Sequence, residues 1–261
     1  MNKKTVLIFF LGFISSSFIF GIIGLAQRSV SHASGPPKAV ILAPSIPKET
    51  PNLVPRSSTP NRQVQIEEIP RSVETAAFKT FLSPKPDAHS ALYEIKPGDT
   101  LADISRKYHM TADLVRLVNH IEGDRLILGS KLKIPTYKLS VVVDKSQNTL
   151  ILKGDEEVLK TYTVSTGANN STPVGIFKIT NKLIHPTWYK SDGKVIPYGS
   201  PANYLGSRWM GISVKGYGIH GTLEPEKLGR QVTHGCVRMK NEEVEELYGF
   251  LTPGTEVTIV D

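Results

Sequence analysis

Short segments that alternate apolar and polar residues dominate the second half of this 261-residue chain. Alternation with a period of two residues is typical of half-buried strands. The segments lie at residues 139–144, 149–152, 157–165, 175–180 and 256–260. Between them one helix is indicated, from Asn241, the expected N-cap, to about Phe250. Residues 138–261 are therefore predicted to form a mostly β domain, a sandwich or barrel with one main helix.

A different pattern occupies residues 92–136. Tyr93-Glu94-Ile95 predicts a short strand, and helical spacing follows from Leu101 and again from Thr111. Leu132-Lys-Ile-Pro135 predicts a closing strand. We expect a small βααβ module here.

The first 91 residues have two compositions. Lys3 and Lys4 precede an uncharged run from Thr5 to Ala26, which as a helix is long enough to cross a bilayer of roughly 30 Å. Residues 1–26 therefore predict a single-pass membrane anchor with the rest of the chain outside the cytoplasm. A cleaved signal peptide is the alternative, because small residues at 24–26 and 31–33 have cleavage-site spacing. Residues 27–91 hold ten of the eighteen prolines and predict a proline-rich disordered linker.

Charge and cysteine content narrow the function. The formal net charge is +7, which favours anionic surroundings such as a cell envelope or nucleic acid. The basic residues are scattered and no nucleic-acid reader motif is present, so we expect no nucleic-acid partner. Cys236 is the only cysteine, which excludes an intramolecular disulfide.

The residues able to do chemistry gather in two short segments, Gly218–Thr222 and Thr233–Met239. A cysteine nucleophile needs a base to take its proton, and His220 and His234 are the candidates for Cys236. His220 is sixteen residues upstream and must arrive from another strand, which is the usual geometry for a base. By spacing alone, an inert buried cysteine or a zinc site of both histidines and the thiol stays open. Gly235 permits a close backbone approach, and backbone N–H groups there could stabilise an oxyanion. Arg238 could hold a substrate carboxylate or pair with an internal acid.

The module at 92–136 resembles a LysM domain. The resemblance is carried by Tyr93, Pro97-Gly-Asp-Thr-Leu101, Ile104, Tyr108, Leu114, Asn119, Leu126, Gly129, Leu132, Ile134 and Pro135. It implies binding to N-acetylglucosamine-containing glycans such as peptidoglycan. The implied groove lies between two loops and includes Gly98, Asp99, Thr100, Leu101 and Ile121. Capping of the following helix is the alternative role for Asp99 and Thr100.

Residues 139–260 resemble the YkuD-type L,D-transpeptidases. Five ordered blocks carry the resemblance: Val164-Ser-Thr-Gly167, Thr172-Pro-Val-Gly-Ile-Phe-Lys-Ile179, Leu205-Gly-Ser-Arg-Trp-Met-Gly-Ile212, Gly218-Ile-His-Gly-Thr222 and Thr233-His-Gly-Cys-Val-Arg-Met239. The resemblance implies Cys236 as nucleophile, His220 as base and the Gly221 carbonyl as the group that orients the ring. Thr233, where many members carry serine, belongs with His234, Gly235 and Arg238 to the implied site. Weaker candidates for lining the cleft are Tyr204, Arg208 and Trp209, with core packing as the alternative for Trp209.

The resemblance implies 3→3 cross-linking of peptidoglycan stem peptides through a thioester on Cys236. Three alternatives stay open: a carboxypeptidase or endopeptidase, an enzyme that attaches stem peptides to a lipoprotein, and a wall-binding tether without catalysis. We expect no cofactor and no metal. Expected partners are stem peptides, glycan strands and the cell membrane, with carbapenem-type β-lactams as inhibitors. The expected location is the extracytoplasmic face of a bacterial cell envelope.

Overall fold

The computed structural model describes residues 72–261. The predicted anchor at 1–26 and residues 27–71 of the predicted linker lie outside this range. Within residues 72–261, every helix is too short and too polar to span a lipid bilayer.

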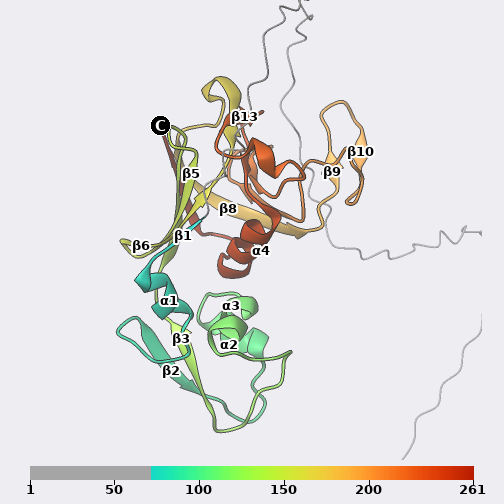
Figure 1. Ribbon diagram of the computed structural model, residues 1–261. Coiled ribbons are helices and arrows are strands. Elements are labelled where there is room, and N and C mark those ends of the chain that lie inside the picture. Colours follow the sequence, from blue (N-terminus) through green and yellow to red (C-terminus); the bar gives the residue numbers. More distant parts are fainter. Residues whose placement is uncertain (1–71) are drawn as a thin grey trace, which may run out of the picture. The chain divides into compact units, whose positions relative to one another are not determined.

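A nine-stranded sheet organises the larger domain (Figure 1). Its strands, in spatial order, are β1 (Val73–Glu74), β6 (Glu157–Thr163), β5 (Thr149–Gly154), β4 (Leu139–Asp144), β15 (Glu256–Val260), β8 (Gly175–Ile184), β11 (Arg208–Ile212), β12 (Gly218–His220) and β14 (Val237–Arg238). Most neighbours are antiparallel, whereas β15 pairs with β4 and β12 pairs with β14 in parallel. The prediction of a mostly β domain is confirmed.

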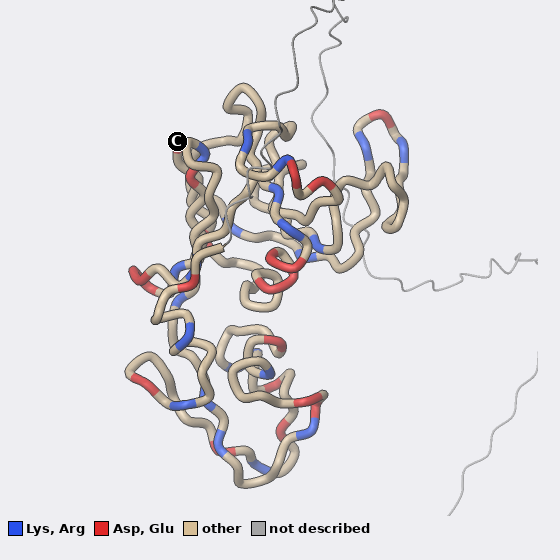
Figure 2. Tube along the Cα trace, viewed as in Figure 1, with Lys and Arg blue, Asp and Glu red and all other residues tan. Residues whose placement is uncertain are grey.

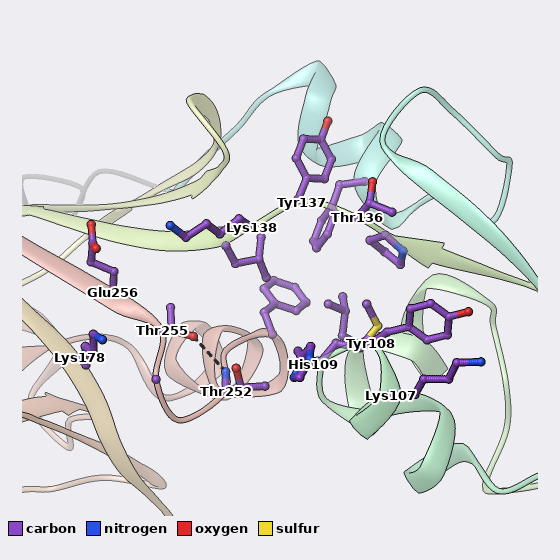
Figure 3. Close-up of a pocket in the computed structure, with 17 residues that line it drawn as sticks. Lys107, Tyr108, His109, Thr136, Tyr137, Lys138, Lys178, Thr252, Thr255 and Glu256 are labelled. Carbon is purple, nitrogen blue, oxygen red and sulfur yellow. Dashed lines mark hydrogen bonds between the residues drawn. The ribbon is translucent and has the colours of Figure 1, made fainter.

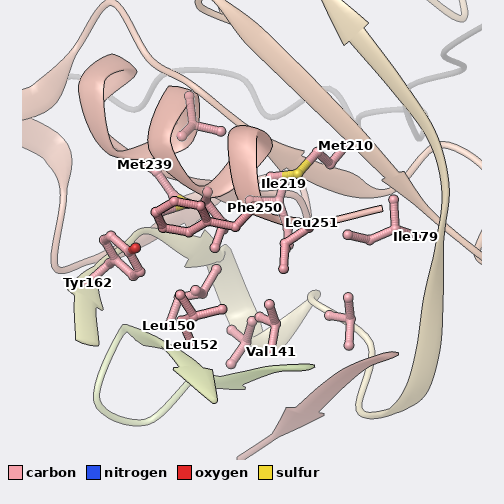
Figure 4. Packing of buried hydrophobic residues seen from close by; sticks show 14 of the residues in the cluster. Val141, Leu150, Leu152, Tyr162, Ile179, Met210, Ile219, Met239, Phe250 and Leu251 are labelled. Atoms are coloured by element: carbon pink, nitrogen blue, oxygen red, sulfur yellow. The ribbon is translucent and has the colours of Figure 1, made fainter. Parts of the chain in front are cut away.

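The core of this domain lies between the sheet and α4 (Asn241–Phe250) (Figure 4). Strands β4 and β5 each send alternate residues inward, so that Val141, Val143, Leu150 and Leu152 are fully buried. Val244, Leu247 and Phe250 form the buried face of α4 at the spacing of one helical stripe. This packing fixes α4 against the strands that carry the candidate site.

The end of the predicted linker is ordered, so the linker prediction is wrong for residues 72–91. β1 pairs with β6, and α1 (Ala76–Leu82) follows it with the Thr75 hydroxyl as its N-cap. Phe78 and Phe81 are buried in the same core as Phe250, against which both rings pack edge to face. The buried rings of Phe78 and Phe81, one helical turn apart, stabilise this segment. The high proline content of residues 27–91 gave no indication of this burial.

The module that follows α1 has the predicted βααβ order. β2 (Ser90–Glu94) pairs with β3 (Lys131–Pro135), and α2 (Leu101–Lys107) and α3 (Ala112–Val118) lie between them in the chain. Its own core includes Ile104, Val115 and Ile134. Because α1 precedes the module and β4 follows it, and both belong to the larger domain, the module is an insertion in that domain.

Shorter elements complete the structure. A hairpin of β9 (Trp188–Tyr189) and β10 (Val195–Ile196) lies in the connection from β8 to β11. β7 (Thr166–Gly167) pairs with β13 (Gln231–Thr233), and the 3₁₀ turns η1 (Ala168–Asn170) and η2 (Pro225–Lys227) follow β7 and precede β13. Basic and acidic residues are interspersed along the trace (Figure 2).

Candidate active site

Strand pairing brings the two predicted segments together. β12 lies beside β14 in parallel register, with Ile219 opposite Val237 and His220 opposite Arg238. Side chains two residues apart on a strand share a face. His220 and Arg238 therefore lie on the same side of the sheet, and Cys236, directly before β14, precedes Arg238 by two residues.

His220 is held by backbone carbonyls. Its Nδ1 lies 2.7 Å from the oxygen of Gly221, and the side chain is buried at 3% exposure. A carbonyl oxygen can only accept, so Nδ1 donates its proton and Nε2 keeps a free lone pair. The Leu205 carbonyl also interacts with the ring and raises its pKa. This is the tautomer that a general base requires.

Cys236 lies against the apolar cluster of Leu205 and Trp209, which Leu183 and Trp188 also join. The cysteine is partly exposed, and its Sγ is 3.6 Å from the Gly216 carbonyl oxygen. Trp209 of this cluster also stacks on the His220 ring, with centroids 5.8 Å apart. The only sulfhydryl and the buried imidazole therefore contact the same tryptophan-containing wall.

Desolvation keeps both groups uncharged at neutral pH. The apolar side chains around the partly exposed Cys236 raise the pKa of its thiol to about 11, against smaller lowering effects of the Gly218 backbone and Arg238. Burial and the charge of Arg238 lower the pKa of His220 to about 3, against the Gly221 and Leu205 carbonyls, which raise it. The resting site therefore holds a protonated thiol and a neutral imidazole.

The turn before Cys236 is tied by two threonine hydroxyls. Thr233 Oγ1 donates to the Cys236 carbonyl at 2.6 Å and accepts the Gly235 N–H at 3.0 Å. Thr172 Oγ1 donates to the Gly235 carbonyl at 2.9 Å and accepts from the N–H of Gly167. Gly235 has φ +124°, and a Cβ there would lie 2.4 Å from the Tyr217 ring. The position demands glycine for both backbone angle and space.

His234 and Arg238, the other site candidates in the Thr233–Met239 segment, differ in exposure. His234 is exposed, two residues before the thiol. Arg238 is largely buried, with one guanidinium nitrogen 3.5 Å from Glu224. Its Nε is buried without a hydrogen-bond partner among residues 72–261. A hydrogen-bond acceptor of a bound molecule would gain binding free energy by pairing with this buried N–H, because the donor is otherwise unsatisfied.

The three weaker cleft candidates have different environments. Trp209 is buried at 2% exposure, and its indole N–H donates to Asn181, so core packing accounts for it together with its contact to His220. Tyr204 is exposed and packs edge to face on Trp188. Arg208 lies against α4, where it pairs with Glu245 at 3.4 Å.

The glycan-site candidates of the LysM-like module lie in two loops, Gly98–Leu101 at the start of α2 and Ile121 after α3. Gly98 and Thr100 are exposed, and Thr100 caps α2 by accepting the Asp103 N–H at 3.1 Å. Asp99 accepts the Tyr93 hydroxyl and the Lys96 N–H, each at 2.8 Å. Leu101 is buried in the module core, and Ile121 is half-buried against it. The exposed part of the candidate groove is thus mainly backbone and polar.

A cavity of about 550 Å³ lies away from these residues (Figure 3). It is bordered by the α2–α3 turn and by residues of β4, β15 and the end of α4, with Phe250 and Tyr137 on its wall. Neither Cys236 nor His220 lines it. We therefore assign the chemistry to the β12–β14 site and not to this cavity.

The sequence did not indicate the supporting roles of three residues: Thr172, Tyr217 and Asn241. For Asn241 the missed role is its tertiary contact. Thr172 lies in one of the five blocks that resemble the L,D-transpeptidases. The sequence feature that could have indicated its role is a hydroxyl directly before Pro173 and close to Gly175. Tyr217 precedes Gly218, yet nothing in the sequence indicates that its ring meets Gly235. Asn241 was predicted to cap α4, and this is wrong: Lys240 is the N-cap residue, and the Asn241 side chain bonds elsewhere.

Comparison with known families agrees with both resemblances. Residues 138–259 match the L,D-transpeptidase catalytic domain, and residues 93–135 match the LysM domain. YqjB of Bacillus subtilis, whose curated name assigns it to the L,D-transpeptidases, is 42% identical over 127 residues, which cover 46% of this chain and 70% of that protein. YkuD of the same organism, with the same kind of name, is 32% identical over 174 residues, covering 64% of this chain and 97% of that protein.

A solved L,D-transpeptidase from Mycobacterium smegmatis is 22% identical, with a TM-score of 0.42 over 52% of this chain and 65% of that one. The part that matches the L,D-transpeptidase catalytic domain is the β domain that holds Cys236 and His220. This chain belongs to the L,D-transpeptidase family and carries a LysM domain before its catalytic domain.

Proposed function

We propose that the protein forms 3→3 cross-links between peptidoglycan stem peptides, with Cys236 as the nucleophile and His220 as the base. The single observation that carries this proposal is the His220 ring, held through Nδ1 by Gly221 and sharing the Trp209 wall with the only cysteine. Family membership supports the reaction class, and the site supports the division of roles.

The first half-reaction acylates the enzyme. Cys236 Sγ attacks the carbonyl carbon of the third, dibasic residue of a tetrapeptide stem while Nε2 of His220 takes the thiol proton. The bond to D-alanine then breaks, and the imidazolium returns that proton to the departing amine. Because the resting thiol and imidazole are both neutral, proton transfer accompanies attack and does not precede it.

The second half-reaction uses an amine from a neighbouring stem. The amine attacks the thioester and loses a proton to His220, and the thiolate leaves and is protonated again. The apolar cluster of Leu205 and Trp209, against which Cys236 packs, limits water at the thioester. This favours the amine over hydrolysis, and so favours transpeptidation over the carboxypeptidase and endopeptidase alternatives.

Arg238 is our candidate for holding the donor. Its buried Nε lacks a partner in residues 72–261, and its charge lies near both reacting groups, since it lowers the pKa of each. A carboxylate or carbonyl of the stem would satisfy that nitrogen. The exposed Gly98–Thr100 turn of the LysM domain is the candidate contact for the glycan strand.

These domains indicate a cell-wall-associated protein that works outside the cytoplasm. Attachment to the membrane through residues 1–26 is part of the proposal, and it rests on the basic and apolar sequence of that segment. Fractionation of cells that express the full chain tests it. Recovery of the protein in the soluble envelope fraction and not with the membrane would contradict the anchor.

Product analysis tests the reaction itself. Purified protein is incubated with a disaccharide tetrapeptide and the products are separated by mass. Cross-linked dimers that have lost one D-alanine per bond support transpeptidation. Tripeptide alone, even with added amine acceptor, would make the protein a carboxypeptidase. No change in the wild-type sample would leave only the wall-binding tether.

A further inference from the structure

The side chain of Asn241 joins two segments that lie far apart in the chain. Its Oδ1 accepts the Ser207 N–H at 3.0 Å, and its Nδ2 donates to the Thr222 carbonyl at 3.0 Å. Ser207 precedes β11, and Thr222 follows β12 by two residues. Asn241 is the first residue of α4, so one amide links a helix and the ends of two strands.

Two glycines make room for this amide. A Cβ on Gly206 would lie 2.4 Å from Asn241 Oδ1, and a Cβ on Gly221 would lie 2.1 Å from the same atom. Contacts this short do not occur for real side chains. The slot therefore fits the asparagine amide only because both flanking positions lack a side chain.

The two segments also carry the carbonyls that hold the imidazole. Gly221, whose oxygen accepts from His220 Nδ1, immediately precedes Thr222. Leu205, whose carbonyl interacts with the ring and raises its pKa, is two residues before Ser207. The Gly221 peptide is further fixed from its N–H, which donates to the Arg208 carbonyl at 3.2 Å. Asn241 thus anchors the backbone next to the Gly221 acceptor of His220 and close in the chain to Leu205.

The opposite end of α4 is fixed as well. Lys182 Nζ donates to the carbonyls of Tyr248 and Leu251, each at 2.6 Å, and its ammonium lies over the Tyr248 ring. Cations near a helix C-terminus satisfy its last carbonyls. With its C-terminal end fixed and its apolar face buried, α4 provides a rigid support for the amide at its first residue.

We propose that Asn241 is a positioning residue for the reaction: it holds the Gly221 carbonyl where His220 is kept in the Nδ1–H form with Nε2 free for the thiol of Cys236. This inference rests on the proposed function for its kinetic consequence, but its structural consequence, one imidazole tautomer, is independent of it. Asn241 touches neither substrate nor the reacting atoms and acts through His220.

The test compares Asn241→Ala and Asn241→Asp with the wild-type protein. Alanine removes both hydrogen bonds, whereas aspartate has nearly the same volume, keeps the acceptor for Ser207 and loses the donor to Thr222. Two readouts are taken: the second-order rate at which a carbapenem acylates Cys236, by intact mass, and the tautomer of His220, by the ¹⁵N chemical shifts of its ring. Small displacements of a catalytic group cost on the order of 10- to 100-fold in rate, which is the loss expected for both variants.

Asn119→Ala is the matched control. Asn119 likewise joins two segments: its side chain bonds Lys133 at both N–H and carbonyl, and the Val115 carbonyl, within the LysM domain. We expect it to lower the melting temperature while leaving the acylation rate and the His220 tautomer as in the wild type. In the Asn241 variants we expect slow acylation and a mixture of His220 tautomers.

The inference is overturned if both Asn241 variants keep a single Nδ1–H tautomer, whatever their stability. A wild-type protein that fails to react with the carbapenem would contradict the proposed function instead, and the ring shifts would still decide the role of Asn241. If Asn241→Ala does not fold, the nearly isosteric aspartate variant carries the comparison.

Discussion

Trp209 and His220 lie opposite each other on β11 and β12, with ring centroids 5.8 Å apart and 21° between the ring planes. The indole is itself fixed, because its N–H donates to Asn181 at 3.2 Å. One face of the imidazole is thereby closed to water. This contact contributes to the burial that keeps His220 neutral, and it links the stacking of two rings to the protonation state on which the chemistry depends.

The thiol should titrate at high pH. Its pKa is raised to about 11, so the thiolate fraction grows tenfold with each pH unit below that value. We expect the rate of Cys236 alkylation by iodoacetamide to rise through pH 7 to 10 without a plateau. Stopped measurements by intact mass across this range check it. A plateau beginning near pH 6 would mean a preformed thiolate–imidazolium pair and would contradict the neutral resting state.

Replacement of His220 by glutamine should slow acylation of Cys236 by a factor on the order of 10² to 10⁴, the usual contribution of a general base. The exposed His234 is the comparison, because it is the other histidine near the thiol in the chain. His234→Gln is expected to cost much less. Equal losses, measured as second-order rates with a carbapenem, would remove the basis for choosing His220.

Gly235→Ala should abolish adduct formation while the protein still folds. The substitution meets two obstacles, a φ of +124° and the Tyr217 ring 2.4 Å from the new Cβ. Gly254→Ala is the matched control. Gly254 has φ +94°, and a Cβ added there would have no neighbouring atom within 4 Å. Both should lose stability by about 1–3 kcal/mol through backbone strain. Only the change at Gly235 should displace Cys236, and a Gly235→Ala protein that reacts at the wild-type rate would contradict this role.

The segment before the LysM domain should contribute to the stability of the catalytic domain. Phe78 is 2% exposed, and its truncation to alanine should cost about 3–5 kcal/mol in the free energy of unfolding. Val73→Ala is the control, because Val73 is exposed. Denaturant unfolding of both variants checks the difference. Equal stabilities would restore the view that this segment is only a linker.

Alternating patterns in the sequence predict the strands that have one buried and one solvent-exposed face. They do not predict the strands that are buried on both faces. β4, β5 and β15 alternate and were predicted almost to the residue, because one side of each meets the core and the other meets water. β11 and β12 are buried on nearly every residue, so they show no period of two. α1 was missed because two phenylalanines within a proline-rich composition do not form a recognisable pattern.

The candidate site was predictable to a similar degree. The sequence predicts Cys236, His220 and Gly221, because the motifs that resemble the L,D-transpeptidases contain them. The tertiary partners were not, since the contact of Tyr217 with Gly235 and the bonds of Asn241 to Ser207 and Thr222 exist only once distant segments pack. Asn241 fits the sequence pattern of a helix N-cap, so the sequence alone predicts that local role and not the tertiary hydrogen bonds to Ser207 and Thr222.

The central claim is that Cys236 carries a stem peptide as a thioester, and the mass of the intact protein tests it most directly. Wild-type protein is mixed with a disaccharide tetrapeptide, quenched in acid within the first turnovers and digested to locate any adduct. We predict an added mass equal to the donor minus D-alanine, on the peptide that contains Cys236, and no adduct in a Cys236→Ser protein. Release of D-alanine by that serine variant at the wild-type rate, or an adduct on another residue, would contradict the account.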